Sequence, residues 1–368
     1  MSALVEQAMP HLVVAPVLVP MLAAALMLLA GEGRRSLEVV LGAAAMLAGL
    51  AASVALLAQV GARGPIVYVA GGWPAAFGIA VVADRLAALL LVLTWTLGPC
   101  ALAFASARWH RAGVHFHPLL QLQLMGLSGA FLAGDVFNLF VFFEITLAAS
   151  YGLVLHGSGR RRVQAGLHYL AVNLAASSLF LVGATMLYGV TGTLNLAALS
   201  QRAAHLAAAD RALVHAAAAI LGVAFLAKAA AWPLNFWLVP AYAAATAPAA
   251  AVFAILTKLG VYSIARVFTL LLAGDASAAS GADALLALGA VTAALASLGM
   301  IGTQRLALQA GLSVIVSAGT LLGALGLQRA EVTGGALFYL VSSTLTASAL
   351  FLVVDLVERW RNAGITRS

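Results

Sequence analysis

The chain has 368 residues, of which 64% are hydrophobic and only 8% are charged. Soluble domains carry about 25% charged residues, so the composition excludes an ordinary soluble protein and indicates an integral membrane protein. The net charge of +7 does not indicate nucleic-acid binding, because Lys and Arg gather on the cytoplasmic loops of membrane proteins. The single cysteine, Cys100, allows neither an internal disulfide nor a cysteine-based metal site.

Long apolar runs predict the fold class. A helix needs about 20 apolar residues to cross the roughly 30 Å hydrocarbon core of a bilayer, and eleven such runs can be drawn. The alternation typical of a closed barrel is absent, so the spanning elements are predicted to be helices and the chain an all-α polytopic membrane protein. The predicted spans are 11–30, 37–60, 81–106, 117–134, 136–157, 164–190, 211–231, 246–271, 282–303, 306–327 and 333–356.

The amino-terminal segment and the distribution of arginine predict the topology. Residues 1–10 contain no Lys or Arg and therefore lack the positive region of a cleavable signal, so we expect the first run to be a retained helix. If the amino terminus lies outside, eleven arginines fall in the inside connections and six in the outside ones. Because positive residues favour the cytoplasmic side, we expect the amino terminus outside and the carboxyl terminus in the cytoplasm.

Three charged residues lie within apolar runs, at membrane depth. The chain has only two lysines, Lys228 and Lys258, and both fall inside such runs, whereas every arginine falls at or near a span end. Glu144 is the clearest buried acid, nine residues past Asp135 and so roughly 13 Å along a helix. A charge at the bilayer centre costs at least about 2.5 kcal/mol, so such residues usually face a partner or a water-filled path.

This selection of residue types is what a proton path requires. A desolvated lysine can release its proton, whereas arginine stays charged, so Glu144, Lys228 and Lys258 are predicted to relay protons. Two alternatives remain open. The Glu–Lys pair could only fix the packing of the helices, and Lys258 could reach the membrane surface if its span is shifted by one turn.

A proline-rich segment follows Lys228, with the sequence AWPLNFWLVPAYAAATAP. Each proline removes an amide donor, so an unbroken helix is not expected through Pro233, Pro240 and Pro248. Broken helices beside buried charges are typical of transporters. The alternative is an interfacial loop with a belt of aromatic residues.

The histidines carry weaker signals. His110, His115 and His117 lie together in a connection with two arginines, and we expect them to be solvated. None of them forms a helical pair with a nearby acid, so no metal site is predicted.

Other polar residues could extend the proton path. His156 and His168 are candidates because imidazole titrates near neutrality, and Asn138 is a candidate for holding water beside the relay. Pro233 is a candidate hinge in the broken helix. The alternative for the histidines and Asn138 is an ordinary structural role between helices. No motif for a phosphate, a haem or a nucleophilic residue is present, so we predict no catalytic residues, no cofactor and no enzymatic activity.

Three long segments carry a family resemblance: GGWPAAFGIAVVADRLAALLLVLT, GAFLAGDVFNLFVFFEITLAASYGLVLHG and FLAKAAAWPLNFWLVPAYAAATAPAAAVFAILTKLGVYSIARVF. In these segments the chain resembles the D-type subunit of the multisubunit Mrp/Pha-type monovalent cation/proton antiporters. More distantly it is similar to the antiporter-like subunits of respiratory complex I and of membrane hydrogenases. The resemblance implies that Glu144 is the family's fifth-helix glutamate, Lys228 the lysine of its broken seventh helix and Lys258 the lysine of its eighth helix, joined by water in one half-channel.

The resemblance also implies a division of the chain. Three leading helices would occupy 1–110, a first five-helix repeat with the broken helix 111–273, and a partial second inverted repeat with a cytoplasmic tail 274–368. Family members are usually longer, and the late-helix Lys or Glu of their path has no counterpart here, while Ser342 stands where a histidine is expected. We therefore expect either that another subunit supplies the second half-channel or that the chain is a shortened, inactive form.

The predicted function is that of a membrane subunit of a Na+ or K+/proton antiporter in the bacterial inner membrane. Its expected partners are protons, monovalent cations, other membrane subunits and lipid, with no nucleic acid. One alternative is a proton-pumping subunit of a complex I-like NADH:quinone oxidoreductase or membrane hydrogenase. The other is a scaffold subunit that has no transport activity.

Overall fold

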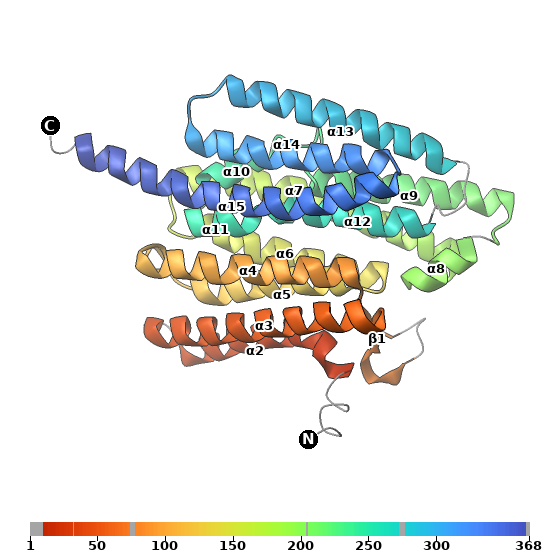
Figure 1. Ribbon diagram of the computed structural model, residues 1–368, viewed down its shortest axis with the longest axis horizontal. Coiled ribbons are helices and arrows are strands. Elements are labelled where there is room, and N and C mark those ends of the chain that lie inside the picture. Colours follow the sequence, from red (N-terminus) through yellow and green to blue (C-terminus); the bar gives the residue numbers. More distant parts are fainter. Residues whose placement is uncertain (1–9, 32, 74–77, 204, 272–276, 366–368) are drawn as a thin grey trace.

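The computed structural model describes residues 10–31, 33–73, 78–203, 205–271 and 277–365, and these are almost entirely helical (Figure 1). The predicted all-α class is confirmed. We expected no cleavable signal from residues 1–10, and nine of these ten residues lie outside the described part of the chain. The long helices are α2 (Ala15–Ala30), α3 (Arg35–Arg63), α4 (Arg85–Ala107), α5 (Phe116–Leu132), α6 (Val136–Leu155), α7 (Arg160–Thr191), α9 (Ala208–Lys228), α12 (Leu256–Leu271), α13 (Ser277–Ile301), α14 (Leu306–Gly326) and α15 (Ala330–Ile365).

Within the described residues, ten helices are long and apolar enough to cross a membrane. The remaining predicted span corresponds to α5, which has 17 residues and packs along α6 in the opposite direction. Leu119 of α5 faces Gly152 of α6, and Gly126 faces Thr146. Figure 1 shows the long helices lying roughly side by side, with α2 and α3 at one edge of the bundle and α13 and α14 at the other.

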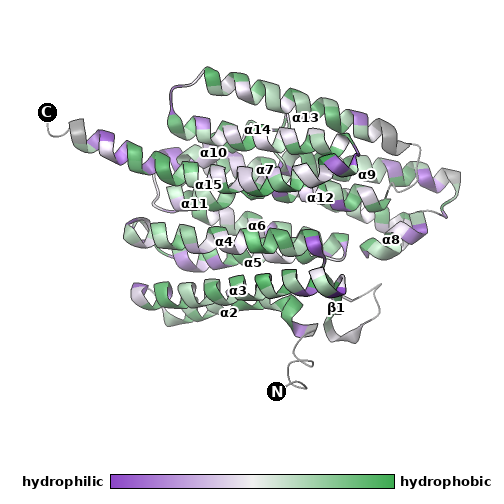
Figure 2. Cartoon of the chain, in the orientation of Figure 1, coloured by the Kyte–Doolittle hydropathy of each residue, from purple (hydrophilic) through white to green (hydrophobic). Residues whose placement is uncertain are grey.

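Hydropathy follows this arrangement. In Figure 2 hydrophobic residues cover the bodies of the helices, and hydrophilic residues gather toward their ends. Many large apolar side chains on the outside of the bundle are exposed, for example Leu29 and Phe338, as expected for surfaces that contact lipid rather than water.

Polar contacts hold the bundle together at each end. At one end, called here the Trp109 end, the indole of Trp109 donates to Asp355 of α15 at 3.1 Å, and the Trp109 carbonyl oxygen lies 2.9 Å from His156 Nε2. At the opposite end, called here the Asp84 end, Asp84 forms an ion pair with Arg266 of α12.

A small β-hairpin at the Asp84 end was not predicted. Strand β1 (Ile66–Val69) pairs antiparallel with β2 (Ala80–Ala83), in a register that places Ile66 opposite Ala83. The hairpin delivers the chain to Asp84, whose carboxylate accepts a hydrogen bond from the Ala87 amide at 2.8 Å and caps α4. Short helices complete the fold: η1 (Pro10–Val14), η2 (Ala70–Gly72), η3 (Trp109–Arg111), α8 (Leu196–Ala203), α10 (Leu238–Ala244) and α11 (Ala247–Phe253).

The predicted interruption after Lys228 is confirmed. Helix α9 ends at Lys228, residues 229–237 form turns, and the chain resumes with the short helices α10 and α11. Pro248 lies in the first turn of α11, where a missing amide hydrogen leaves no intrahelical bond unmade. A second interruption, at residues 254–255, separates α11 from α12, whereas one continuous span was predicted there.

Glycine allows α13 and α14 to approach until their backbones touch. A Cβ atom at Gly319 of α14 would lie 2.6 Å from the backbone nitrogen of Ala293 on α13, and one at Gly326 would lie 2.5 Å from that of Leu286. No larger residue fits at these positions unless the two helices separate.

We therefore expect Gly319→Val to force α13 and α14 apart and to lower the free energy of unfolding by about 1–3 kcal/mol. Thermal unfolding of the detergent-solubilised protein, followed by circular dichroism, measures the change. Gly334→Val in α15 is the matched control, because a Cβ there meets no atom within 4 Å. Equal melting temperatures for the two variants would contradict the close packing.

Candidate functional site

Lys258 lies in the centre of the protein. Its side chain, on α12, has 0% exposure, and its ammonium donates to the hydroxyl of Ser317 on α14 and to that of Thr257 at 3.3 Å. Because the side chain is fully buried among hydroxyls, it does not extend to the membrane surface, and that alternative is excluded. Among the described residues Lys258 forms no ion pair.

Lys228 is the last residue of α9 and directly precedes the interruption. It is 8% exposed, and its ammonium lies 5.4 Å from the centre of the Phe143 ring on α6. The next residue on α6 is Glu144, whose carboxylate accepts a hydrogen bond from the hydroxyl of Ser177 on α7 and lies near enough to Lys228 for the two charges to interact. Glu144, predicted to be buried, is only half-buried. It follows the ring that Lys228 contacts, but the two charges form no ion pair within the described residues.

A small cavity adjoins Lys228. Its volume is about 20 Å³, which is enough for one water molecule. Its polar lining consists of Lys228, Thr146 of α6, and Tyr169 and Asn173 of α7, and its apolar lining includes Leu256 and Leu259 of α12, on either side of Lys258. The Thr146 hydroxyl has no hydrogen-bond partner among the described residues. The cavity therefore lies between Lys228 and the helix that carries Lys258.

Gly260 brings that helix close to the broken one. A Cβ atom at this position would lie 2.5 Å from the backbone nitrogen of Ala229 and 2.9 Å from the carbonyl carbon of Lys228. Gly260 lies two residues after Lys258. Because it has no side chain, α12 can contact the backbone at the point where α9 ends. Both lysines consequently lie on elements that are in direct contact.

Comparison with known proteins shows the family of the chain. The family described as NADH:quinone oxidoreductase/Mrp antiporter, TM, matches residues 133–366. The probable D-type K(+)/H(+) antiporter subunit of Rhizobium meliloti (strain 1021) is 52% identical over 361 residues, covering 96% of this chain and 67% of that protein. The chain belongs to the family of D-type Mrp antiporter subunits. The recognition made from the sequence is confirmed.

Further relatives agree with this membership. The D-type Na(+)/H(+) antiporter subunit of Alkalihalophilus pseudofirmus (strain ATCC BAA-2126 / JCM 17055 / OF4) is 33% identical over 354 residues, covering 95% of this chain and 71% of that protein. A chain of the Mrp complex from Dietzia sp. DQ12-45-1b superposes with a TM-score of 0.87 at 31% identity, covering 94% of this chain and 65% of that chain. The chain spans about two thirds of the length of these relatives, which are subunits of transporters rather than enzymes.

The other candidates for the path in this D-type antiporter subunit lie at different depths. His156 is 5% exposed at the Trp109 end. Asn138 is 8% exposed in the first turn of α6, and its side-chain amide nitrogen, Nδ2, has no partner among the described residues. Pro233 lies in the interruption after Lys228. His168 is exposed on α7, where its Nδ1 lies 3.0 Å from the Gln164 carbonyl oxygen, and it is not among the described residues that line the cavity beside Lys228.

The expectation that the histidines of residues 108–117 are solvated is wrong for two of them. His110 is 8% exposed and His117 is 2% exposed, and Nδ1 of His110 lies 3.2 Å from Nε2 of His117. The buried Phe116 fixes the start of α5, which brings His117 into the bundle, and η3 places His110 against it. The spacing of seven residues across a short connection was the signal that could have indicated this pair.

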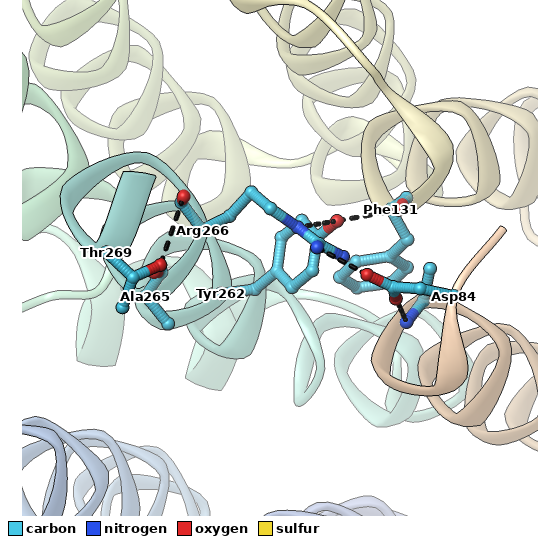
Figure 3. A network of polar contacts seen from close by, with 7 residues as sticks. Asp84, Phe131, Tyr262, Ala265, Arg266 and Thr269 are labelled. Atoms are coloured by element: carbon cyan, nitrogen blue, oxygen red, sulfur yellow. Dashed lines mark hydrogen bonds and ion pairs between the residues drawn. The ribbon is translucent and has the colours of Figure 1, made fainter. Parts of the chain in front are cut away.

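A second group that the sequence did not indicate anchors α12 at the Asp84 end (Figure 3). Arg266 forms an ion pair with Asp84, and the hydroxyl of Tyr262 donates to the Phe131 carbonyl oxygen of α5 at 2.7 Å. Lys258, Tyr262 and Arg266 are spaced by four residues and share one face of α12. The contacts with α4 and α5 therefore fix the rotation of the helix that carries Lys258.

The carboxylate of Asp84 depends on this contact. Burial by itself would raise the pKa of Asp84, but hydrogen bonds from Arg266 and the Ala87 amide, with the charge of Arg266, hold it below its ordinary value of 3.8. A group whose pKa is lowered on folding stabilises the protein above its unfolded pKa, and this contribution disappears as the pH falls through the folded pKa.

We expect Asp84→Asn to lower the free energy of unfolding at pH 7 by about 1–3 kcal/mol, because Arg266 loses its counter-charge. Between about pH 5 and pH 3 the variant should lose less stability than the parent, because it lacks the titrating group. Thermal unfolding in detergent across this range tests both expectations, with Asp210→Asn, an exposed acid of α9, as control. Parallel pH profiles for parent and Asp84→Asn would refute the assignment.

Proposed function

We propose that the chain is the proton-conducting membrane subunit of a monovalent cation/proton antiporter and that Glu144, Lys228 and Lys258 relay protons through it. The observation that carries this proposal is the burial of both lysines around one helix interruption, with a carboxylate beside the first and only hydroxyls beside the second. Lysines buried in this way are costly unless they can be neutralised.

The partners of the two lysines suit them to opposite steps of a transfer. Lys228 has a carboxylate, that of Glu144, in its neighbourhood, so we assign it the step in which a proton is taken up. Ser317 and Thr257 present hydroxyls, which accept a hydrogen bond from an ammonium and donate one to a neutral amine. Lys258 therefore keeps its partners in both protonation states, and a proton can pass to it without leaving a buried polar group unbonded.

A water molecule in the cavity beside Lys228 would connect the two steps. The cavity has the volume for one water and offers it Lys228, Asn173 and the unpaired hydroxyl of Thr146. Such a water needs about two to four polar partners. It would carry the proton that Lys228 releases toward α12, and Lys228 would then be free to take up the next proton.

The names of the relatives favour antiport over the alternatives. They are K(+)/H(+) and Na(+)/H(+) antiporter subunits, so we propose K+ or Na+ as the exchanged ion and other membrane subunits as partners. A proton-pumping subunit of a complex I-like enzyme is the second candidate, because the matching family includes NADH:quinone oxidoreductase. A scaffold that does not transport gives no reason for Lys258 to be buried without a counter-charge.

The topology and the division of the chain complete the proposal. We place the Trp109 end in the cytoplasm and the Asp84 end outside a bacterial inner membrane, because most of the arginines outside the spans lie at the Trp109 end. Residues 1–110 would form the leading helices, 111–273 the first repeat and 274–368 part of the second.

Lys228→Ala, in the assembled antiporter complex reconstituted into vesicles, is expected to reduce cation/proton exchange to the rate of empty vesicles. Lys228→Arg should fail as well, because arginine keeps its charge. Arg211→Ala, at the exposed start of the same helix, is the control and should exchange at the parental rate. Parental exchange by a Lys228→Ala complex that contains all its subunits would refute the relay.

The topology can be tested with single cysteines in a Cys100→Ala background. We expect Ser158→Cys, at the Trp109 end, to react with a membrane-impermeant maleimide only in inverted vesicles. Gln201→Cys, on α8, should react only in cells or right-side-out vesicles. Both positions are exposed. The reverse labelling pattern would invert the proposed orientation.

A further inference from the structure

A cavity of about 500 Å³ lies at the Trp109 end and is called here the Arg160 cavity. Its volume is within the range of about 300–1,000 Å³ that is usual for small-molecule sites. The start of α7, the connection between α10 and α11, the beginning of α14 and the part of α15 around Asp355 surround it. It shares no described lining residue with the smaller cavity beside Lys228, so it is a separate place in the protein.

The lining of the Arg160 cavity combines basic and apolar groups. The start of α7 contributes three consecutive arginines, Arg160, Arg161 and Arg162. The other elements contribute mostly apolar side chains, among them Ala307 of α14 and Phe351 of α15. A molecule that has one charged part and one apolar part therefore meets a matching surface for each.

The charge of this lining favours an anion. Its two acids, Asp355 and Glu358, both lie on α15. Asp355 already accepts a hydrogen bond from the indole of Trp109 and forms an ion pair with Arg359. The three arginines of α7 therefore outweigh the acids, and the positive side of the cavity is the side formed by α7.

The position of the arginines at a helix start adds to this preference. Helix α7 begins at Arg160, and Gly159 before it provides no side-chain cap, so the amides of the first turn have no intrahelical partner. The positive end of the helix dipole also lies here and disfavours cations. Arg162 donates to the Ala244 carbonyl oxygen of α10 at 3.0 Å, whereas Arg160 and Arg161 are exposed and form no ion pair with another described residue. An anion against this turn would offset the cost.

We propose that the Arg160 cavity binds a phosphate group, carried by the headgroup of an anionic lipid or by a soluble phosphate ester. Guanidinium groups bind phosphate through two parallel hydrogen bonds, and the free amides of a helix start provide further donors. Basic pockets between the helices of membrane proteins bind lipid headgroups in this way. The apolar lining favours the lipid, because its apolar part would lie against Phe351 and Ala307. The site is separate from the proton relay, and its test does not use transport.

Binding in this cavity should stabilise the fold. A ligand would join the start of α7 to the connection between α10 and α11, and both of these to α15, although the three elements lie far apart in the sequence. A molecule that binds only the folded protein raises its melting temperature as the concentration of the molecule increases. The melting temperature therefore reports occupancy of the site.

The test is thermal unfolding of the full chain in a neutral detergent, with increasing amounts of phosphatidylglycerol. We expect the lipid to raise the melting temperature of the parent. The double variant Arg160→Gln, Arg161→Gln should need at least about tenfold more lipid for the same shift, because it loses two charge-assisted contacts. Phosphatidylcholine, whose phosphate is balanced by its own ammonium group, should shift neither protein.

The matched control is the double variant Arg34→Gln, Arg35→Gln. It also removes two consecutive exposed arginines at a helix start of the same end, and neither of them is among the described residues that line the cavity. It should respond to phosphatidylglycerol like the parent.

Two further measurements separate binding from folding. Without lipid, Arg160→Gln, Arg161→Gln should melt at or above the temperature of the parent, because two cations have left the positive end of α7. Ala307→Phe keeps both arginines and narrows the cavity, so it should also weaken the effect of phosphatidylglycerol.

Glycerol 3-phosphate, added in place of lipid, distinguishes the two sources of phosphate. A shift with phosphatidylglycerol alone supports the lipid, and a shift with glycerol 3-phosphate that Arg160→Gln, Arg161→Gln lacks supports a soluble ester. The absence of any shift of the parent with either compound would overturn the site. Equal dependence on phosphatidylglycerol in the parent, in Arg160→Gln, Arg161→Gln and in Ala307→Phe would overturn it as well.

Discussion

The cost of placing a charge or an unbonded polar atom in hydrocarbon governs this structure. A protein with so few charged residues can hold a lysine at membrane depth only if the neighbouring helices provide partners. Lys258 has two hydroxyls, and Lys228 lies beside an aromatic ring. The helices that supply these groups come from distant parts of the sequence, so the packing of the bundle and the chemistry of its interior depend on each other.

Interruptions and small residues make that packing possible. The end of α9 at Lys228 frees backbone groups, which the adjacent turns and side chains satisfy. The indole of Trp237 donates to the Ala227 carbonyl oxygen at 3.1 Å, and the hydroxyl of Tyr242 donates to that of Phe253 at 3.0 Å. Non-helical backbone is tolerated at membrane depth only where such partners are available. Gly260 then lets α12 reach the same place.

Much of this architecture could be predicted from the sequence, because it follows from strong, local signals. Apolar runs indicated the spans, and the contrast between two buried lysines and many terminal arginines indicated the centre of the protein. Proline indicated the interruption after Lys228. Each of these features follows from the free-energy cost of placing charged or unbonded polar groups of a single segment in the membrane.

What could not be predicted depends on pairs of distant side chains. Ser317 supports Lys258 from α14, and nothing in the surrounding residues distinguishes it from other serines that bond only to their own helix, such as Ser313. The ion pair of Asp84 with Arg266 joins positions 182 residues apart. The contact between His110 and His117 could not be predicted, because a connection that contains two arginines is expected to be exposed. Burial of Phe116 instead places His117 inside the bundle.

Trp109 has a consequence for the order in which the protein can be assembled. The guanidinium groups of Arg108, Arg162 and Arg359 lie 5.3–5.9 Å from its ring, and its indole is bonded to Asp355, 246 positions later in the chain. Most of the chain must therefore leave the ribosome before this residue can acquire its full set of neighbours. Before α15 is inserted, Trp109 can contact Arg108 and Arg162. Its contacts with Asp355 and Arg359 form only after α15 has been inserted.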